Sequence, residues 1–393
     1  MDFHSPGPIT AFDHSPQTRL VFSPGAIARL GEFARHLGGT RALIVTDPGL
    51  ATAGHASKAE ESLIKAGITP LRYDRVRENP TTWDVDECVA SARAGRADLL
   101  IGLGGGSSMD TAKGCNFLLT NGGEMRDYWG VGKATHPMLP FIAVPTTAGT
   151  GSECQSAALI ANATTHQKMA CLDPKAAARI ALLDPELTLS LPAGVTAATG
   201  VDAVSHALES AVSTRRNRIS TLYSTEAFGL CLHGLKAVLT VPTDIENRGR
   251  MLLGAAFGGL AIENSMLGAA HAAANPLTAR FNVIHGTAVG LMLPSVIRFN
   301  SADPAAAAIY AQLAVQAGLA GSHSSTPMAI QLLVSALETL LNLAGIPRSL
   351  AACGIRSEVF PELANDAAKQ WTAGFNPRAI TTADFISLYR SVA

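Results

Sequence analysis

The chain has 393 residues, of which 47% are hydrophobic and 16% are charged, and its formal net charge is -1. This length exceeds what one hydrophobic core usually fills, so two domains are expected, and the composition excludes a disordered or fibrous chain. The near-zero charge gives no electrostatic footprint for nucleic acid or an anionic membrane surface, so a small, weakly charged partner fits better.

Residues 1–190 are predicted to form an α/β domain. Short apolar runs alternate with helical patterns there, and the clearest strands are expected at residues 42–46, 99–103, 141–144 and 180–183. This alternation is typical of βαβ units and of a largely parallel sheet that is buried on both faces. Ligands of such sheets bind beyond the carboxyl ends of the strands.

The turn after residues 99–103 is glycine-rich and reads GGGSSMD (104–110), with a helix expected from Thr111. Glycines at a strand-to-helix turn let backbone N–H groups approach a pyrophosphate, and the positive end of the following helix favours the anion. An ordinary tight turn is the alternative, because Ser107 occupies the last glycine position of the usual G-x-G-x-x-G pattern.

Two further segments offer groups to a nucleotide. The segment PTTAGTGSE (145–153) follows the strand at 141–144 and presents hydroxyls and glycines to phosphate or ribose oxygens. Asp47 follows the first clear strand, where a carboxylate accepts hydrogen bonds from ribose hydroxyls and repels a 2′-phosphate, which favours NAD over NADP. Because this acid precedes the glycines instead of following them, a standard Rossmann half is disfavoured.

Residues 191–393 are predicted to form an all-helical domain, with the seam near Pro192. Long stretches rich in alanine and leucine carry apolar positions at helical spacing, as at residues 202–213 and 326–344. No apolar run reaches the roughly 18 residues that span a membrane, no secretory signal is recognised, and the scattered cysteines predict free thiols. A cytoplasmic protein is expected.

Two pairs of side chains in the second half are spaced four residues apart, namely Asp202 with His206 and His271 with Asn275. Residues at this spacing project from one face of a helix. His285 follows fourteen residues after His271. Three imidazoles and one carboxylate suit a divalent first-row metal such as Fe²⁺ or Zn²⁺. A structural histidine on an alanine-rich helix is the alternative for each imidazole taken alone.

Together these segments resemble the iron-containing (group III) alcohol dehydrogenase family, which includes lactaldehyde reductase and propanediol dehydrogenases. The resemblance runs from VFSPGA (21–26) through GGGSSMDTAK, PTTAGTGSE and GVDAVSHALE to NPRAITTADFISLY (376–389), nearly the whole chain. It implies a dinucleotide-binding α/β domain, a helical metal-binding domain, and hydride transfer between NAD(H) and a small alcohol or aldehyde. It also implies a homo-oligomer, a dimer or larger.

The resemblance further implies which residues form the site. One divalent metal, Fe²⁺ in the first place and Zn²⁺ as the alternative, would polarise the reacting oxygen and be held by Asp202, His206, His271 and His285. The implied cofactor-binding positions are Asp47, Asn79, Gly105, Gly106, Ser107, Asp110, Thr146, Thr147, Thr150 and Lys168.

Two positions depart from the family pattern. Asn275 stands where many relatives carry a histidine near the nicotinamide, and an amide cannot shuttle protons as imidazole does. The proton is therefore expected to leave through water and the cofactor ribose. Ala157 stands where some relatives place a polar residue that touches the cofactor, which predicts the loss of one hydrogen bond.

Three other functions compete with this interpretation. A glycerol dehydrogenase or maleylacetate reductase activity is the nearest rival, although Asp202 and the three histidines argue against its metal-free form. A lyase similar to dehydroquinate synthase, which uses NAD transiently with a metal, is the rival from another enzyme class. A noncatalytic nucleotide sensor is the third, but it has no need of a four-ligand metal site.

Overall fold

The computed structural model describes residues 11–165 and 167–393. They divide into two compact units, an α/β unit (Pro16–Leu191) and a helical unit (Pro192–Ala393). Residues 11–15, which the sequence places in the first domain, group with the helical unit, where His14 Nδ1 lies 2.9 Å from Asn264 Oδ1. The first ten residues of the predicted α/β domain lie outside the described part.

The α/β unit is built on a six-stranded sheet in the order β1-β9-β6-β4-β2-β3, and all its neighbouring strands are parallel. Its strands are β1 (Arg19–Phe22), β2 (Arg41–Val45), β3 (Thr69–Tyr73), β4 (Leu99–Gly104), β6 (Phe141–Pro145) and β9 (Ile180–Leu183). A small second sheet has the order β5-β8-β7 and contains β5 (Gly130–Val131), β7 (Ala157–Ala161) and β8 (Lys168–Leu172), with β7 and β8 antiparallel. The predicted mostly parallel sheet is confirmed.

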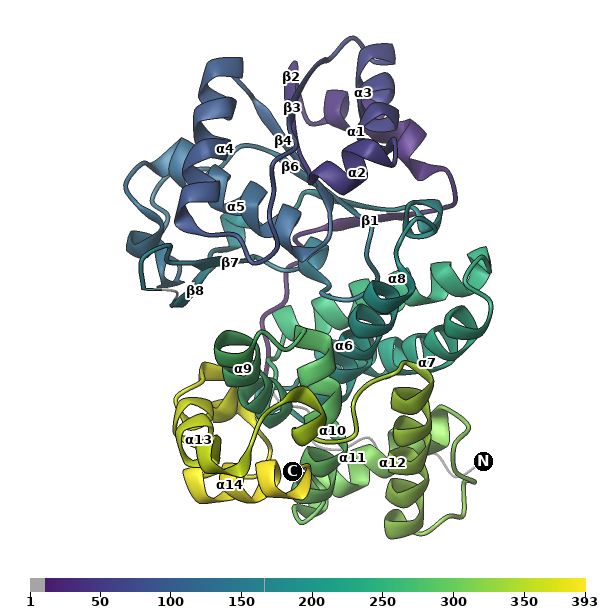
Figure 1. Ribbon diagram of the computed structural model, residues 1–393. Helices are drawn as coiled ribbons and strands as arrows, with labels where there is room; N and C mark the ends of the chain where they lie inside the picture. The colour runs from purple at the N-terminus through teal and green to yellow at the C-terminus, as the bar shows by residue number, and fades with distance from the viewer. Residues whose placement is uncertain (1–10, 166) are drawn as a thin grey trace. The chain divides into compact units, whose positions relative to one another are not determined.

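Helices cover both faces of the main sheet (Figure 1). They are α1 (Leu30–His36), α2 (Pro48–Thr52), α3 (His55–Lys65), α4 (Thr82–Gly95) and α5 (Gly106–Asn121). Side chains of β4 alternate between two cores: Ile101 packs in the core with α1 and α3, and Leu100 packs in the core with α4 and α5. Burial on both faces explains why the central strands are continuous apolar runs.

The carboxyl ends of three neighbouring strands bring the nucleotide motifs to one edge of the sheet. β2, β4 and β6 are adjacent and parallel, so the residues that follow Val45, Gly104 and Pro145 emerge at this edge. The N–H of Thr146 donates to the carbonyl of Gly104 at 3.0 Å, which ties the last two turns together.

Within residues 192–393, all of which the structure describes, there are helices and no strand. The main helices are α6 (Ala193–Val212), α7 (Arg218–Thr240), α8 (Ile245–Glu263), α9 (Ala269–Phe281), α10 (His285–Asn300), α11 (Pro304–Gln316), α12 (Thr326–Leu343), α13 (Phe360–Ala368) and α14 (Thr382–Ser391). This confirms the predicted all-helical second half.

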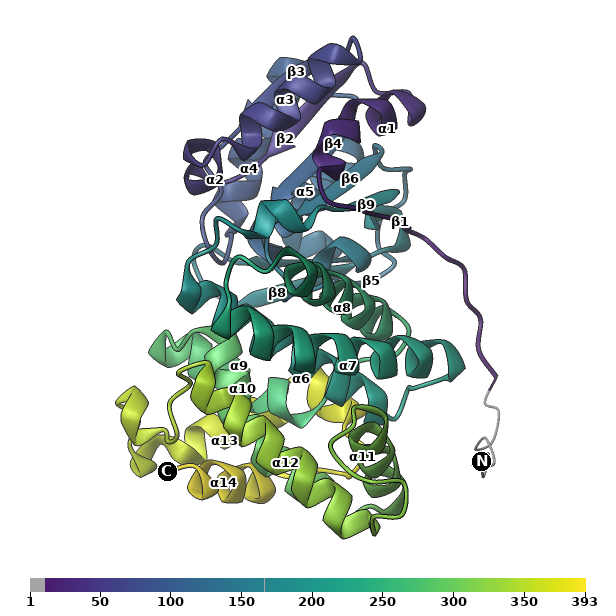
Figure 2. The same cartoon turned by 90° about the vertical axis from the view of Figure 1, so that its right-hand side faces the viewer.

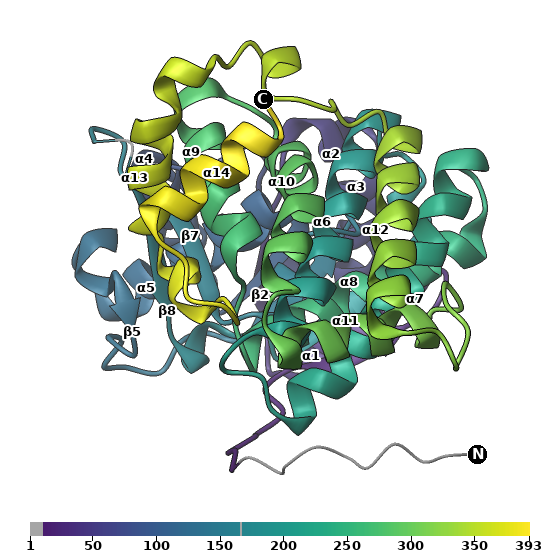
Figure 3. The ribbon, with the colours of Figure 1, turned by 90° about the horizontal axis from the view of Figure 1, so that it is seen from below.

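Helix α6 lies in the interior of the helical unit and contacts α7, α8, α9, α10 and α11 (Figures 2 and 3). Most of its side chains are buried, including the polar Asp202, His206 and Glu209. A buried polar side chain needs a hydrogen-bond or ion-pair partner. The polar side chains of α6 must therefore find such partners inside the helical unit. The last helix, α14, reaches back to α9, where the Tyr389 hydroxyl donates to the Ala273 carbonyl at 2.7 Å.

Among the described helices, α12 is long and apolar enough to cross a membrane by length and composition alone. It buries Leu333, Leu337 and Leu340 within the helical unit. On another side its Glu338 accepts a hydrogen bond from Arg298 of α10. The core helix of a folded domain passes the same test, so α12 is weak evidence for a membrane span.

Candidate nucleotide and metal sites

The glycine-rich turn is shorter than predicted, because α5 begins at Gly106 and not at Thr111. Ser107 and Asp110 therefore lie in the first turns of the helix. Gly105 is the N-cap residue and has no side chain with which to cap the first N–H groups of α5. Backbone N–H groups at a helix start without a side-chain cap attract an anion such as a diphosphate.

The two predicted phosphate segments lie against each other. A Cβ atom added at Gly105 would come within 3.1 Å of Thr147 Cγ2, and one added at Gly106 within 3.0 Å of Thr150 Cγ2. Only glycine allows the two threonines to approach the start of α5 this closely. The hydroxyls of both threonines thus lie beside the N-terminal amide groups of α5, and this arrangement fits a nucleotide diphosphate.

Three other predicted cofactor residues lie on separate elements of the α/β unit. Asp47 caps α2, where its carboxylate accepts a hydrogen bond from the N–H of Leu50 at 3.0 Å. Asn79 is exposed, has a positive φ of 53°, and donates its N–H to Ser107 Oγ at 3.3 Å. Lys168 is an exposed residue at the start of β8. Asn79 thus contacts the first turn of α5, and one Asp47 oxygen already serves the α2 cap.

Lys113 joins the two phosphate segments, although no sequence prediction singled it out. It is fully buried, and its ammonium group donates to Ser152 O at 2.6 Å, Ser152 Oγ at 3.0 Å and Ala157 O at 3.1 Å. Ser152 Oγ in turn donates to Asp110 Oδ1 at 3.3 Å. A lysine three residues after Asp110 on one helix face was the available signal, but buried lysines are rare.

Two carboxyl groups beside this lysine have raised pKa values. Burial raises the pKa of Asp110 to about 6, even though the nearby Lys113 and Lys168 lower it. Burial also raises the pKa of Glu153 to about 7. Glu153 Oε1 accepts no hydrogen bond from the part of the chain that the structure describes. Near neutral pH the Glu153 carboxyl is therefore only partly ionised, and Lys113 lies close to the charge that Asp110 carries.

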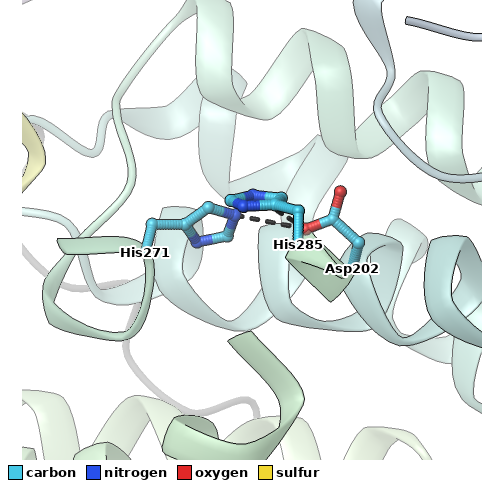
Figure 4. Close-up of side chains that lie close together, drawn as sticks. All are labelled: Asp202, His271 and His285. Atoms are coloured by element: carbon cyan, nitrogen blue, oxygen red, sulfur yellow. Dashed lines mark hydrogen bonds and ion pairs between the residues drawn. The ribbon is translucent and has the colours of Figure 1, made fainter. Parts of the chain in front are cut away.

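The predicted metal ligands converge on one carboxylate oxygen. Asp202 and His206 project from α6, His271 from α9, and His285 is the first residue of α10. The Nε2 atoms of His271, His206 and His285 lie 3.3, 3.4 and 3.8 Å from Asp202 Oδ1. Figure 4 shows the side chains of Asp202, His271 and His285 pointing toward one another.

These separations fit one divalent cation. Bonds of about 2.1 Å in a tetrahedral site place neighbouring ligand atoms roughly 3.4 Å apart. Ligand atoms of Asp202, His271 and His285 all lie within 4.8 Å of one another. The side chain of His285 is 39% exposed, whereas those of Asp202 and His206 are each 6% exposed. The donor set is thus buried on one side and accessible at His285.

Charge within the cluster is balanced by the residues themselves. Burial raises the pKa of Asp202, but His206, His271 and His285 outweigh this effect and hold it well below its ordinary value. Burial lowers the pKa of His271, but the carboxylates of Glu209 and Asp202 outweigh this effect and raise it to about 9. Protonated imidazole thus supplies the positive charge that a bound cation would supply.

Glu209 belongs to the same cluster, although the sequence predictions omitted it. Its Oε2 accepts a hydrogen bond from His271 Nδ1, and its Oε1 accepts one from the N–H of Ala270 at 2.6 Å. Asp202, His206 and Glu209 follow an i, i+4, i+7 spacing on one helix face, so periodicity could have revealed it.

The two positions that depart from the family pattern have ordinary contacts. Asn275, one turn after His271 on α9, is half-buried and donates through Nδ2 to Gln370 Oε1 at 3.0 Å. Ala157 begins β7, and its carbonyl is one of the three acceptors of Lys113. Neither contact assigns a catalytic role to these positions.

A parallel α/β unit that offers a helix start to a nucleotide, followed by a helical unit with three imidazoles around one carboxylate, is the architecture that the sequence resemblance implies for a metal-dependent dehydrogenase. Residues 16–185 match the model of the iron-containing alcohol dehydrogenase family, and residues 196–393 match the C-terminal model of the Fe-containing alcohol dehydrogenase family. The chain belongs to the iron-containing alcohol dehydrogenase family, as the sequence resemblance predicted.

Individual relatives span nearly the whole chain. Alcohol dehydrogenase 4 of Schizosaccharomyces pombe is 34% identical over 98% of this chain and 89% of that protein. The NAD-dependent methanol dehydrogenase of Bacillus methanolicus is 32% identical over 94% of this chain and 97% of that protein. The crystal structure of a 1,3-propanediol oxidoreductase has a TM-score of 0.94 and 32% identity, and covers 98% of this chain and 100% of that chain.

Proposed function

We propose that the chain is an NAD-dependent alcohol dehydrogenase and aldehyde reductase that acts on a small alcohol or aldehyde. The observation that carries the proposal is the convergence of three imidazole Nε2 atoms, within 3.3 to 3.8 Å, on Asp202 Oδ1. Membership of the iron-containing alcohol dehydrogenase family supports it, as do relatives named for methanol and 1,3-propanediol.

In the helical unit, Asp202, His206, His271 and His285 would hold one divalent metal, in the first place Fe²⁺. When bound, the metal acts as a Lewis acid on the substrate oxygen, and the nicotinamide accepts or donates the hydride. The four side chains fix the position of the cation, and the exposed side of the cluster at His285 leaves room for a substrate oxygen.

In the α/β unit, the start of α5 and the two threonines would hold the diphosphate of NAD. The N–H groups after Gly105 and the hydroxyls of Thr147 and Thr150 lie together. Asn79 donates its N–H to Ser107 in the same turn of α5, and Lys168 lies near enough to Asp110 to lower its pKa. Asp47 would accept a hydrogen bond from the adenosine ribose through the oxygen that α2 leaves available, which favours NAD over NADP.

Proton release is assigned to water and the cofactor ribose, because Asn275 cannot take up a proton. Its amide donates to Gln370 and so has a structural role as well. The buried carboxylates near Lys113 are not assigned to proton transfer. The reacting alcohol proton therefore has no assigned side-chain acceptor.

The experiment that tests the proposal is a panel of short aldehydes and diols, followed by NADH absorbance, with the metal-free protein reloaded with Fe²⁺ or Zn²⁺. A dehydrogenase consumes one NADH per aldehyde reduced and depends on the metal. A lyase leaves the NADH pool unchanged during turnover, and a sensor binds NADH without turnover. Metal-independent oxidation of glycerol would favour the nearest rival instead.

Location and assembly are further parts of the proposal. We propose a cytoplasmic protein that acts as a homo-oligomer, a dimer or larger. Light scattering of the purified chain across a dilution series tests the assembly, and a monomer at all concentrations contradicts it.

A further inference from the structure

Glu209 uses its two carboxylate oxygens for two different partners. It is 3% exposed and lies on α6, one turn beyond His206. Oε2 accepts a hydrogen bond from His271 Nδ1, and Oε1 accepts one from the N–H of Ala270 at 2.6 Å. Both partners belong to the first turn of α9. One buried carboxylate therefore contacts the helix and a candidate ligand that the helix carries.

The start of α9 is built to receive this carboxylate. Gly268 precedes the helix and provides no side-chain cap. A Cβ atom at Gly268 would lie 3.1 Å from Glu209 Oε1 and 3.1 Å from Asn376 Oδ1, so glycine keeps this space open. The N–H groups and the positive end of a helix favour a negative group at this point. Glu209 thus caps α9 from a neighbouring helix.

When His271 is neutral, as a metal ligand must be, the same contact decides which of its nitrogens carries the proton. A neutral imidazole has one N–H donor and one acceptor nitrogen. If Nδ1–H donates to Glu209, Nε2 keeps its lone pair, and Nε2 is the atom that lies 3.3 Å from Asp202 Oδ1. A partner of this kind orients metal-binding histidines in general.

We propose that Glu209 is a positioning residue of the metal site: it holds His271 in the Nδ1–H form and fixes the start of α9 beside Asp202. The inference rests on the proposed function, since it presumes that His271 Nε2 binds the metal. It adds a fifth residue, one that does not contact the metal itself.

Glu209→Gln separates the two contacts of the carboxylate, one with the Ala270 N–H and one with His271 Nδ1. Glutamine has the same shape but one acceptor oxygen, and its NH₂ group can only donate. If that oxygen accepts from the Ala270 N–H, the NH₂ group faces His271 Nδ1 and favours the form with the proton on Nε2. That proton occupies the position of the metal, so the substitution should weaken metal binding even where the fold is intact.

The test is a competition between the protein and a chelator for Zn²⁺, with the Zn²⁺ affinity compared between the parent chain and Glu209→Gln. We expect the variant to bind Zn²⁺ about 10- to 100-fold more weakly. Asp303→Asn is the matched control, because Asp303 caps α11 by accepting from the N–H of Ala306 at 2.8 Å. The control should retain the parent affinity. Equal affinities of Glu209→Gln and parent would overturn the proposal.

A second measurement remains valid if Glu209→Gln fails to fold. In the Zn²⁺-loaded parent chain, long-range ¹H–¹⁵N NMR of labelled histidines reports which ring nitrogen is protonated. We expect His271 to be bound through Nε2 and protonated at Nδ1, with an Nδ1–H signal that shows a strong hydrogen bond to a carboxylate. A His271 ring bound through Nδ1, or one whose Nδ1–H shows no such hydrogen bond, would contradict the proposal.

Failure of this inference differs from failure of the proposed function. If the parent chain binds no Zn²⁺ or Fe²⁺ and still reduces aldehydes, the metal-dependent mechanism is wrong. If the parent chain binds metal and requires it, but Glu209→Gln matches it in affinity, only the role of Glu209 is wrong.

Discussion

The two units shift the pKa values of their buried and half-buried carboxyl groups in opposite directions. In the α/β unit, burial raises the pKa of Asp110 to about 6 and that of Glu153 to about 7, despite a buried lysine nearby. In the helical unit, three histidines overcome burial and hold the pKa of Asp202 well below its ordinary value. Near its candidate ligand site, one unit thus disfavours the ionisation of its carboxyl groups, and the other favours it.

This difference indicates which kind of ligand each unit receives. A site for a diphosphate gains from neutral carboxyl groups and backbone N–H donors, because a carboxylate would repel the anion. A cation site gains from an ionised carboxylate with imidazoles around it. Four substitutions test this difference between the units.

The largest effect is expected from His285→Ala, which removes one nitrogen from the cluster in the helical unit. We expect turnover to fall on the order of 10³-fold, equivalent to roughly 4 kcal/mol of transition-state stabilisation. Most of the bound metal should be lost as well, while NADH affinity should stay as in the parent chain. Metal analysis and NADH fluorescence titration measure the two quantities. Full activity without metal would contradict the assignment of the metal site to the helical unit.

Glu153→Gln tests the charge suppression in the α/β unit. Because the folded state holds the Glu153 proton more tightly, the stability of the parent chain falls as pH rises between about 4.5 and about 7. The variant cannot ionise there, so we expect similar stability at pH 5 and a gain of up to about 3 kcal/mol over the parent at pH 8. Denaturant unfolding at both pH values measures it.

Glu358→Gln is the matched control for this change, because Glu358 is exposed. Its effect on unfolding should be small and equal at the two pH values. If Glu153→Gln is equally neutral at pH 8, the carboxyl is ionised without cost and the contrast between the units is weaker than described.

Gly106→Ala should affect the α/β unit alone. The added Cβ atom would lie 3.0 Å from Thr150 Cγ2, so the threonine or the start of α5 must shift. We expect NADH to bind about tenfold more weakly, equivalent to about 1.4 kcal/mol, with the metal content unchanged. Gly229→Ala is the control, since Gly229 lies within α7 and an added Cβ atom there would have no atom within 4 Å among the described residues, apart from its chain neighbours and the backbone of α7. Unchanged NADH affinity in Gly106→Ala would remove this turn from the site.

The smallest effect is expected from Asn275→His. An imidazole on α9 restores a group that exchanges protons near neutral pH. We expect alcohol oxidation near pH 7 to rise by about threefold, with a shifted pH profile. Rates measured from pH 6 to 9 decide the matter, and an unchanged profile means that position 275 takes no part in proton release.

The sheet was predictable where strands are buried on both faces. β2, β4, β6 and β9 are continuous apolar runs and were predicted within one or two residues. β1 and β3 were not predicted, because both are edge strands that are partly exposed and carry mixed side chains. Those two segments form strands because they pair with neighbours in the folded sheet, and their own side-chain pattern does not indicate it.

The metal cluster shows a different limit. Spacing indicated that Asp202 and His206 share a helix face, but the meeting of α6, α9 and α10 depends on how the helices pack. Only the family resemblance supplied that information before the structure. Glu209 and Lys113 were missed because their roles depend on what surrounds them: each is a buried charged residue whose partners lie on other segments.

The segment after residue 369 supports α9 from several directions. The Gln370 amide oxygen accepts from Asn275, the Asn376 amide oxygen accepts from the Ala269 N–H, and the Tyr389 hydroxyl binds the Ala273 carbonyl. A chain that stopped before this segment would contain every candidate metal ligand. Its helix α9 would nevertheless lack the hydrogen bonds that hold His271 in position. During synthesis on the ribosome, the chain would thus become able to bind the metal only after the residues up to Tyr389 had been made and had packed against α9.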